Sequence, residues 1–244
     1  MPAAPAPGGL GLRLAGWAVH SYTALGSVLA LLVVLSAIDG RVEAALWWGL
    51  AALVVDGTDG MLARAARVKQ TLPWFDGALL DNIVDYLAYV FAPVVLLWTT
   101  GALPHGIGGQ VLAALPLLAS AYQFCRTDAK TDDHTFLGFP SYWNVLAFYV
   151  LVLDLGRPVT GVLVVVLSVL VFVPIRYLYP SRSGTLRGLS LVLSALWGVS
   201  YVVLLLQYPD PSPVVVVLSL AYLAYYLGVS LLLTSRATRR RTAR

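Results

Sequence analysis

The chain has 244 residues, of which 59% are hydrophobic and only 11% charged, and its formal net charge is +4. About a quarter of the residues in an ordinary soluble protein are charged, so this composition excludes that class. The single cysteine, Cys125, excludes a disulfide within the chain. The composition therefore predicts an all-α integral membrane protein.

The chain opens with a Pro-, Ala- and Gly-rich segment, MPAAPAPGG, and residues 1–12 are predicted to form a disordered tail. Eight apolar stretches of spanning or near-spanning length follow. They cover residues 17–38, 43–64, 77–99, 108–126, 140–156, 158–178, 187–207 and 213–235. This predicts a bundle of about eight transmembrane helices. The fifth and sixth stretches are separated only by Asp154 to Pro158, so a count of seven stays open.

The basic residues fall mainly on one side of the eight-span arrangement. If the N-terminus is cytoplasmic, only Arg41 and Arg157 among the sixteen Lys and Arg residues lie outside. This distribution agrees with the positive-inside rule and favours two cytoplasmic termini. Residues 13–235 are then expected to form a single membrane domain. The basic tail at 236–244 is expected to face anionic lipid headgroups, and no nucleic-acid partner is expected.

Five of the twelve acidic residues lie between Asp56 and Asp85, in the strings DGTDGMLAR and GALLDNIVD. Asp56 and Asp59 are three residues apart, and Asp81 and Asp85 are four apart, so each pair shares one face of a helix. If the two faces meet, they form a cluster of four carboxylates near the cytoplasmic interface. Carboxylates at membrane depth are costly unless they are compensated, and hard divalent cations such as Mg²⁺ or Mn²⁺ suit oxygen donors.

Small residues and one arginine accompany the carboxylates. Gly60, Ala63 and Arg64 follow Asp59, and Gly77 stands four residues before Asp81. Small residues let a backbone and a ligand approach closely, and an arginine can take the charge that remains on a metal-bound phosphate. The combination indicates a site for a metal-bound diphosphate.

In order and type, these residues resemble the signature of the CDP-alcohol phosphotransferase family. That signature reads D, two residues, DG, two residues, AR, a gap, then G, three residues, D, three residues, D. The gap here, Ala65 to Asp76, is twelve residues. This is longer than is usual in the family, and the extra residues are expected in a loop between helices. The strings LPWFDGALLDNIVDYLAYVFAP and SAYQFCRTDAKTDDHTFLGFPSYWN are similar to the bacterial phosphatidylcholine synthase branch.

The resemblance implies a transfer of the phosphatidyl group from CDP-diacylglycerol to choline with release of CMP. The resemblance also implies that the enzyme lies in a bacterial inner membrane with its active site on the cytoplasmic side. A homodimer is compatible with this resemblance. It implies two divalent cations, Mn²⁺ or Mg²⁺, held by Asp56, Asp59, Asp81 and Asp85. Asp85 would also act as the general base. The positions implied for the nucleotide are Gly60, Ala63, Arg64 and Gly77.

The quaternary ammonium of choline makes no ordinary hydrogen bond, and aromatic faces are its natural partners. The candidates for the choline site are Tyr86, Tyr122, Tyr142 and Trp143. The competing interpretation is an interfacial aromatic belt, in which Trp and Tyr rings bind no ligand.

Two other functions stay open for the sequence. A sister enzyme that uses serine, inositol or a sugar phosphate as acceptor would share the signature. A cation channel or transporter would also carry carboxylates within the membrane. The transporter is less favoured, because all four carboxylates are expected at one interface and the spacing is more specific than ion binding requires.

Overall fold

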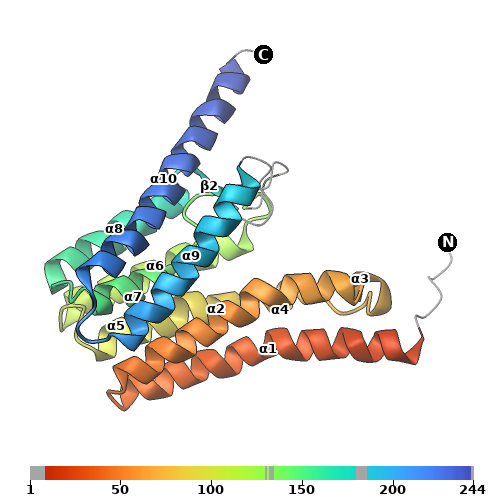
Figure 1. The fold of residues 1–244 in the computed structure, drawn as a ribbon, viewed down its shortest axis with the longest axis horizontal. Helices are drawn as coiled ribbons and strands as arrows, with labels where there is room; N and C mark the ends of the chain where they lie inside the picture. The colour runs from red at the N-terminus through yellow and green to blue at the C-terminus, as the bar shows by residue number, and fades with distance from the viewer. Residues whose placement is uncertain (1–8, 130, 132–134, 180–185, 243–244) are drawn as a thin grey trace. The chain divides into compact units, whose positions relative to one another are not determined.

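The structure is a computed structural model that describes residues 9–129, 131, 135–179 and 186–242 (Figure 1). The chain divides into two compact units, residues 1–99 and residues 100–244, and each is described by itself.

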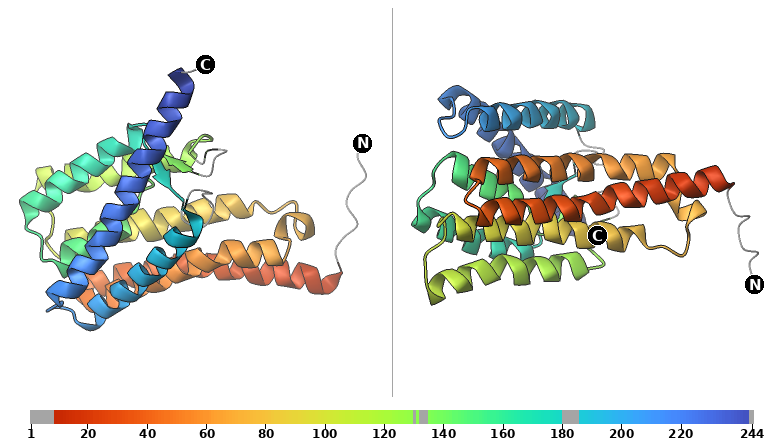
Figure 2. Two further views of the ribbon diagram at one scale, coloured as in Figure 1. Left: turned by 45° about the horizontal axis from the view of Figure 1, so that its top comes forward. Right: turned by 90° about the horizontal axis from the view of Figure 1, so that it is seen from below.

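The first unit consists of three long helical segments and one short helix. Its elements are α1 (Leu10–Ile38), α2 (Val42–Ala65), α3 (Val68–Thr71), α4 (Gly77–Asp85), the π-helix η1 (Tyr86–Phe91) and α5 (Ala92–Thr99). The elements α4, η1 and α5 follow one another directly and form the third segment. Helix α1 packs against both α2 and this third segment, and the views in Figure 2 show the three side by side.

Small residues on α1 allow its neighbours to come close. The buried positions of α1 recur every three or four residues, as expected for one helix face turned to a core. A Cβ atom added at Gly26 would overlap Cγ1 of Val84 on α4, so the glycine lets the two helices touch. At Gly16, an added Cβ would lie 3.0 Å from Cδ1 of Leu72, in the loop after α3.

The loop between α2 and α4 contains the insertion that lengthens the signature. Helix α2 ends at Ala65 and α4 begins at Gly77, so the twelve-residue gap lies between the helices, as predicted. The side chain of Asp76 accepts hydrogen bonds from the backbone N–H groups of Ala78 and Leu79, both at 3.0 Å, and thereby caps α4. The insertion therefore leaves both aspartate-bearing helices intact.

The second unit combines helices with a small sheet. Its elements are α6 (Ile107–Cys125), β1 (Thr135–Leu137), α7 (Trp143–Val152), α8 (Arg157–Phe172), β2 (Arg176–Leu178), α9 (Arg187–Leu206) and α10 (Pro213–Thr242). Strands β1 and β2 pair antiparallel, with Phe136 opposite Tyr177. Helix α10 holds β2 through its hydroxyl groups, because Ser230 Oγ and Thr234 Oγ1 accept backbone N–H groups of the strand at 3.0 and 2.8 Å.

The structure confirms an all-α membrane protein in its broad class, apart from this short sheet. Among the described residues, five helical segments are long and apolar enough to cross a membrane: α1, the α4–α5 segment, α6, α9 and α10. The ten residues of α7 extend about 15 Å, half the thickness of a bilayer core. The expected count of eight spans is therefore not confirmed, and the orientation of the termini stays a prediction.

Two predicted boundaries are wrong. The sixth stretch was expected to run to residue 178, but α8 ends at Phe172. The reason is Pro174, which has no N–H to continue a helix and keeps the preceding residue extended. The expected tail of residues 1–12 extends too far, because α1 begins at Leu10, directly after the last glycine. Residues 1–8 of that tail lie outside the described residues.

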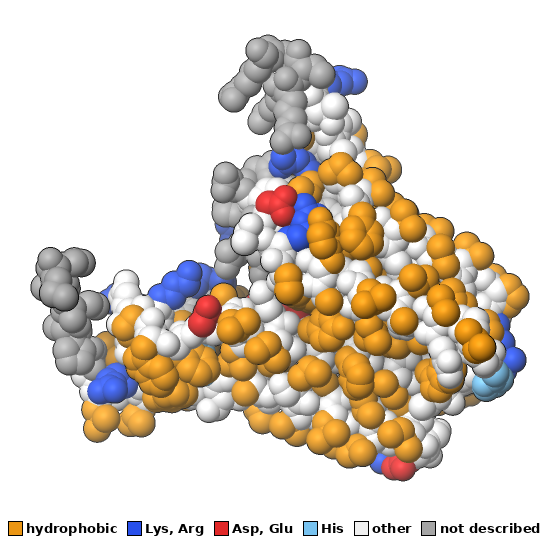
Figure 3. Space-filling view, turned by 180° about the vertical axis from the view of Figure 1, so that it is seen from behind, with side chains coloured by type: hydrophobic (Ala, Val, Ile, Leu, Met, Phe, Trp, Pro, Cys, Tyr) orange, Lys and Arg blue, Asp and Glu red, His pale blue; other side chains and the backbone are white. Residues whose placement is uncertain are grey.

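Apolar side chains dominate the exterior of the long helices. Hydrophobic groups cover most of the face drawn in Figure 3. Val162, Leu196 and Leu218, on three different helices of the second unit, are 62%, 59% and 63% exposed. Such surfaces suit a lipid environment and would be unfavourable in water. The chain is therefore a multi-pass membrane protein.

Candidate functional site

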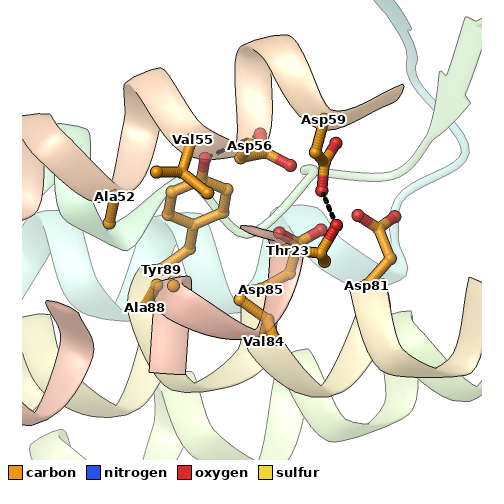
Figure 4. A pocket seen from close by; sticks show the side chains of 11 residues that line it. Thr23, Ala52, Val55, Asp56, Asp59, Asp81, Val84, Asp85, Ala88 and Tyr89 are labelled. Carbon is orange, nitrogen blue, oxygen red and sulfur yellow. Dashed lines mark hydrogen bonds between the residues drawn. The ribbon is translucent and has the colours of Figure 1, made fainter. Parts of the chain in front are cut away.

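Three aspartates of the first unit meet between α2 and α4. Asp56 on α2 and Asp81 and Asp85 on α4 each offer one carboxylate oxygen, and these oxygens lie within 4.8 Å of one another. All three residues are half-buried. They line a small cavity of about 10 Å³ together with Asp59 (Figure 4). The predicted meeting of the two aspartate-bearing faces is therefore seen in the structure.

Asp59 belongs to the same cavity but lies apart from the group of three. Its side chain is 7% exposed, and its Oδ2 atom accepts a hydrogen bond of 2.8 Å from the Thr23 hydroxyl on α1. Figure 4 shows this bond between the two labelled side chains. The bond ties one carboxylate oxygen to α1 and fixes how the side chain enters the cavity.

Asp56 is held in a similar way by Tyr89. The Tyr89 hydroxyl donates a hydrogen bond of 2.7 Å to Asp56 Oδ2, and its side chain is 4% exposed. Tyr89 belongs to η1, the π-helix that begins directly after Asp85. π-Helical turns are rare and occur frequently at functional sites. Here the turn contains the residue that orients a carboxylate of the opposite helix.

The sequence does not identify Thr23 and Tyr89 as partners of these carboxylates. A hydroxyl group within an apolar segment is a signal that something polar lies nearby, because an unpaired polar group is costly in lipid. The partner of each hydroxyl depends on how the helices pack. Only the tertiary structure therefore assigns Thr23 to Asp59 and Tyr89 to Asp56.

The predicted nucleotide positions lie on two elements of the first unit. Gly60, Ala63 and Arg64 follow one another along α2 toward its end, and Arg64 is exposed. A Cβ atom added at Gly60 would lie 3.4 Å from Nη1 of Arg64, so the small residue gives the guanidinium room.

Gly77, the fourth predicted nucleotide position, starts α4 against a histidine of α1. A Cβ atom added at Gly77 would lie 2.7 Å from Cε1 of His20. His20 is 6% exposed, and its ring packs against Phe75 with a centroid distance of 4.4 Å and a tilt of 42° between the planes. Packing against His20 therefore explains locally why a glycine stands at this position.

The four predicted choline contacts have different surroundings. Tyr86 is half-buried at the start of η1, next to Asp85. In the second unit, Tyr122 is 47% exposed, and the guanidinium of Arg126 lies over its ring at 5.5 Å from the centroid. Tyr142 is half-buried and immediately precedes α7.

Trp143 has the environment of a core residue. Its side chain is 0% exposed, and its indole N–H donates a 2.8 Å hydrogen bond to Ser120 Oγ. Phe139 packs edge-on against it, with a centroid distance of 5.4 Å. Burial of this kind favours a packing role for Trp143. Among the predicted choline contacts of the second unit, Tyr142 and Tyr122 retain exposed surface.

The donor set of the cavity fits a hard divalent cation. Carboxylate oxygens are the ligands that Mg²⁺ and Mn²⁺ prefer, and three of them already lie within 4.8 Å of one another. Thr23 and Tyr89 line the same cavity, and their hydrogen bonds orient Asp59 and Asp56. Partners of this kind usually fix the geometry of the ligands of a metal site. The arrangement can therefore bind metal ions and, through them, phosphate groups.

Comparisons with known proteins give consistent relatives. The chain is 42% identical over 223 residues to a phosphatidylcholine synthase of Legionella pneumophila, a match that covers 88% of this chain and 87% of the relative. It is 39% identical over 221 residues to a phosphatidylcholine synthase of Pseudomonas aeruginosa, with 90% and 92% covered. A phosphatidylcholine synthase of Rhizobium johnstonii is 37% identical over 222 residues, with 90% and 91% covered. No protein-family model matches the chain.

Proposed function

The chain belongs to the phosphatidylcholine synthase family of CDP-alcohol phosphotransferases, and from this premise we propose how its aspartate cavity performs the reaction. The enzyme transfers the phosphatidyl group of CDP-diacylglycerol to choline, which yields phosphatidylcholine and CMP. The observation that carries the proposal is the convergence of Asp56, Asp81 and Asp85 within 4.8 Å in one cavity.

The four aspartates of the cavity are the proposed metal ligands. Asp56, Asp59, Asp81 and Asp85 all line it and approach it from two helices. Bound there, two Mg²⁺ or Mn²⁺ ions would neutralise the diphosphate and stabilise the departing CMP. The chain itself contributes the orientation of the ligands, through Thr23 and Tyr89.

Asp85 is the proposed general base for the choline hydroxyl. A hydroxyl group is a weak nucleophile at neutral pH, and a positioned carboxylate that takes its proton contributes on the order of a hundredfold or more to the rate. Asp85 is half-buried in the cavity. After proton removal, the choline oxygen attacks the phosphorus that bears the diacylglycerol, and the bond from this phosphorus to CMP breaks.

Arg64 and the glycines are the proposed nucleotide contacts. The exposed guanidinium of Arg64, at the end of α2, would take phosphate charge that the aspartate site leaves. Gly60, Ala63 and Gly77 leave space for the backbone to approach the nucleotide. Positive charges concentrated at this end of the helices also support a cytoplasmic site in a bacterial inner membrane.

Choline is the proposed acceptor in preference to serine, inositol or a sugar phosphate, because each compared relative is a phosphatidylcholine synthase. The same relatives disfavour the cation channel and the transporter. Tyr86 in the first unit, and Tyr122 and Tyr142 in the second, stay the proposed aromatic contacts of the quaternary ammonium, each taken within its own unit. Trp143 is the less favoured candidate, because its buried indole bonds Ser120.

The test combines an acceptor panel with aspartate substitutions. Purified protein receives labelled CDP-diacylglycerol with choline, serine, inositol or glycerol 3-phosphate, and the lipid product is identified. We expect phosphatidylcholine with choline alone. Asp56→Asn, Asp59→Asn and Asp81→Asn should lose turnover and metal affinity together, whereas Asp85→Asn should retain nucleotide binding better than turnover.

Asp39→Asn is the matched control for these variants. Asp39 is an exposed carboxylate in the turn between α1 and α2, paired with Arg41 at 2.9 Å. Its loss should leave turnover unchanged, because surface ion pairs contribute little to stability. Full activity in Asp85→Asn would assign the base to another residue, and a product formed from serine or inositol would replace the proposed acceptor.

A further inference from the structure

The second unit carries an open groove that has no part in the proposed reaction. The groove lies between α6 and α8 and has a volume of about 380 Å³. Its walls are mainly apolar and include Pro104, Leu112, Val162, Val165 and Val166, with Arg157 at the beginning of α8. A volume of this size falls within the range of about 300–1,000 Å³ that is typical of small-molecule sites.

The groove faces outward from the unit. Val162, Val165 and Val166 are 62%, 42% and 46% exposed, so they present their methyl groups to the surroundings. Gly161 is buried, and a Cβ atom added there would lie 3.3 Å from Cδ1 of Leu112, so the glycine brings α8 close to α6 at the floor of the groove. From Pro158 to Val166 the groove follows α8 for about 12 Å. An extended hydrocarbon chain suits this shape and lining.

The guanidinium of Arg157 lies at one end of the groove and is held in position by hydrogen bonds. The Nε–H group of Arg157 donates a 2.8 Å hydrogen bond to the backbone oxygen of Gly101, and Nη2 lies 3.5 Å from Nε2 of His105. Within the described ranges, no carboxylate lies at ion-pair distance from Arg157. Arg41, by contrast, pairs with Asp39 at 2.9 Å. A backbone carbonyl and a histidine ring thus hold the guanidinium of Arg157, and no acidic side chain among the described residues pairs with it.

We propose that this groove binds an anionic phospholipid, with one acyl chain along α8 and the phosphate at Arg157. Apolar walls recognise the chain, and the exposed guanidinium recognises the phosphate through charge-assisted hydrogen bonds. A lipid with a quaternary ammonium headgroup would bring a second cation close to Arg157, so the site discriminates against it. This inference is independent of the aspartate cavity, which lies in the first unit.

The test measures lipid preference of the full chain. The purified protein is offered equal amounts of phosphatidylglycerol and phosphatidylcholine in neutral detergent, and bound lipids are counted by native mass spectrometry. The unmodified chain should prefer phosphatidylglycerol by about fivefold, the effect of one basic residue near a membrane surface. Arg157→Gln should abolish this preference, and Arg157→Lys should retain most of it. Val165→Trp, at an exposed position of the groove, should reduce binding of both lipids.

Arg41→Gln is the matched control, because it removes the other arginine that the sequence places outside, and the preference should persist in it. Thermal unfolding and choline transfer show whether each variant is folded. An unchanged preference in Arg157→Gln would overturn the proposal, as would loss of the preference in a folded Arg157→Lys. If soluble glycerol 3-phosphate displaced phosphatidylglycerol at equal concentration, the groove would contribute nothing and Arg157 would be only an anion site.

Discussion

Two hydroxyl groups outside the family signature orient two of its carboxylates. Thr23 donates to Asp59 at 2.8 Å, and Tyr89 donates to Asp56 at 2.7 Å. Both donors are less than a tenth exposed, so water competes weakly for these bonds. A carboxylate that already accepts a hydrogen bond through one oxygen is restricted in rotation, so it loses less conformational entropy when it binds a cation. The signature aspartates therefore depend on residues that the signature does not contain.

Tyr89→Phe tests this orientation. The substitution keeps the ring and removes only the hydroxyl, and a hydrogen bond to a charged group contributes about 1.5–3 kcal/mol. We expect the metal concentration for half-maximal activity to rise about tenfold or more, with a smaller fall in turnover at saturating metal.

Tyr22→Phe is the matched control, because the Tyr22 hydroxyl bonds Thr58 at 2.8 Å and touches no signature aspartate. Equal metal requirements in both variants would show that Tyr89 has only a packing role.

Tyr142 and Trp143 are adjacent in sequence but should respond differently to substitution. Tyr142→Leu removes an aromatic face from a half-buried position and should raise the KM for choline by roughly two- to thirtyfold, with little effect on CDP-diacylglycerol. Trp143→Leu creates a cavity in the core and should lower thermal stability instead. The measurements are the two KM values and the unfolding temperature. An unchanged choline KM in folded Tyr142→Leu would leave this residue in the interfacial belt.

At the level of elements, the site depends on how closely α1 approaches α4. Gly26 lines the cavity, and a Cβ atom there would overlap Val84. Asp81 and Asp85 lie on the same helix as Val84, one before it and one directly after it in sequence. A displacement of α4 therefore moves both carboxylates. The π-helix that follows α4 adds a second constraint, because it contains Tyr89. Helix packing and carboxylate geometry are thus coupled.

Gly26→Ala should disturb both stability and activity. Overpacking of this kind typically costs about 1–3 kcal/mol, and the shift of α4 should also weaken metal binding. The double variant Gly26→Ala/Val84→Ala restores space and should recover much of the activity. Gly49→Ala is the control, since a Cβ atom at Gly49 meets no atom within 4 Å. If the double variant were no better than Gly26→Ala, the α1–α4 contact would not be the cause. Activity and thermal unfolding are measured for all variants.

For the whole molecule, the carboxylate cavity predicts dependence on divalent metal. Removal of metal with EDTA should abolish transfer, and Mg²⁺ or Mn²⁺ should restore it. Ca²⁺ should restore it poorly, because it is larger and takes more ligands in a looser geometry. The measurement is phosphatidylcholine formation after metal removal and readdition. Persistent transfer by the metal-free protein would remove the metal ions from the proposed mechanism.

Much of the broad architecture can be predicted from the sequence alone. Composition and the length of the apolar stretches indicate a helical membrane protein, because a bilayer core admits only segments that satisfy their own backbone hydrogen bonds. Spacing of three and four residues places each aspartate pair on one helix face, and the structure brings the two pairs to one cavity. The cap that Asp76 places on α4 is also a local feature, since its side chain accepts from backbone N–H groups two and three residues further on. Each of these features is determined by residues that lie close together in the sequence.

The remaining features depend on contacts between segments that are distant in sequence. The pairing of Tyr89 with Asp56, the overlap that requires Gly26 and the burial of Trp143 each arise from helix packing, which no local pattern encodes. Strands β1 and β2 are each three residues long, which is too short for a periodic signal in the sequence. They form because the fold brings together two backbone segments whose central residues, Phe136 and Tyr177, are 41 positions apart in the chain. The sequence alone determined the membrane class, the family resemblance and the aspartate faces. Only the tertiary structure decided which partners orient the carboxylates, because those bonds form once the helices have packed.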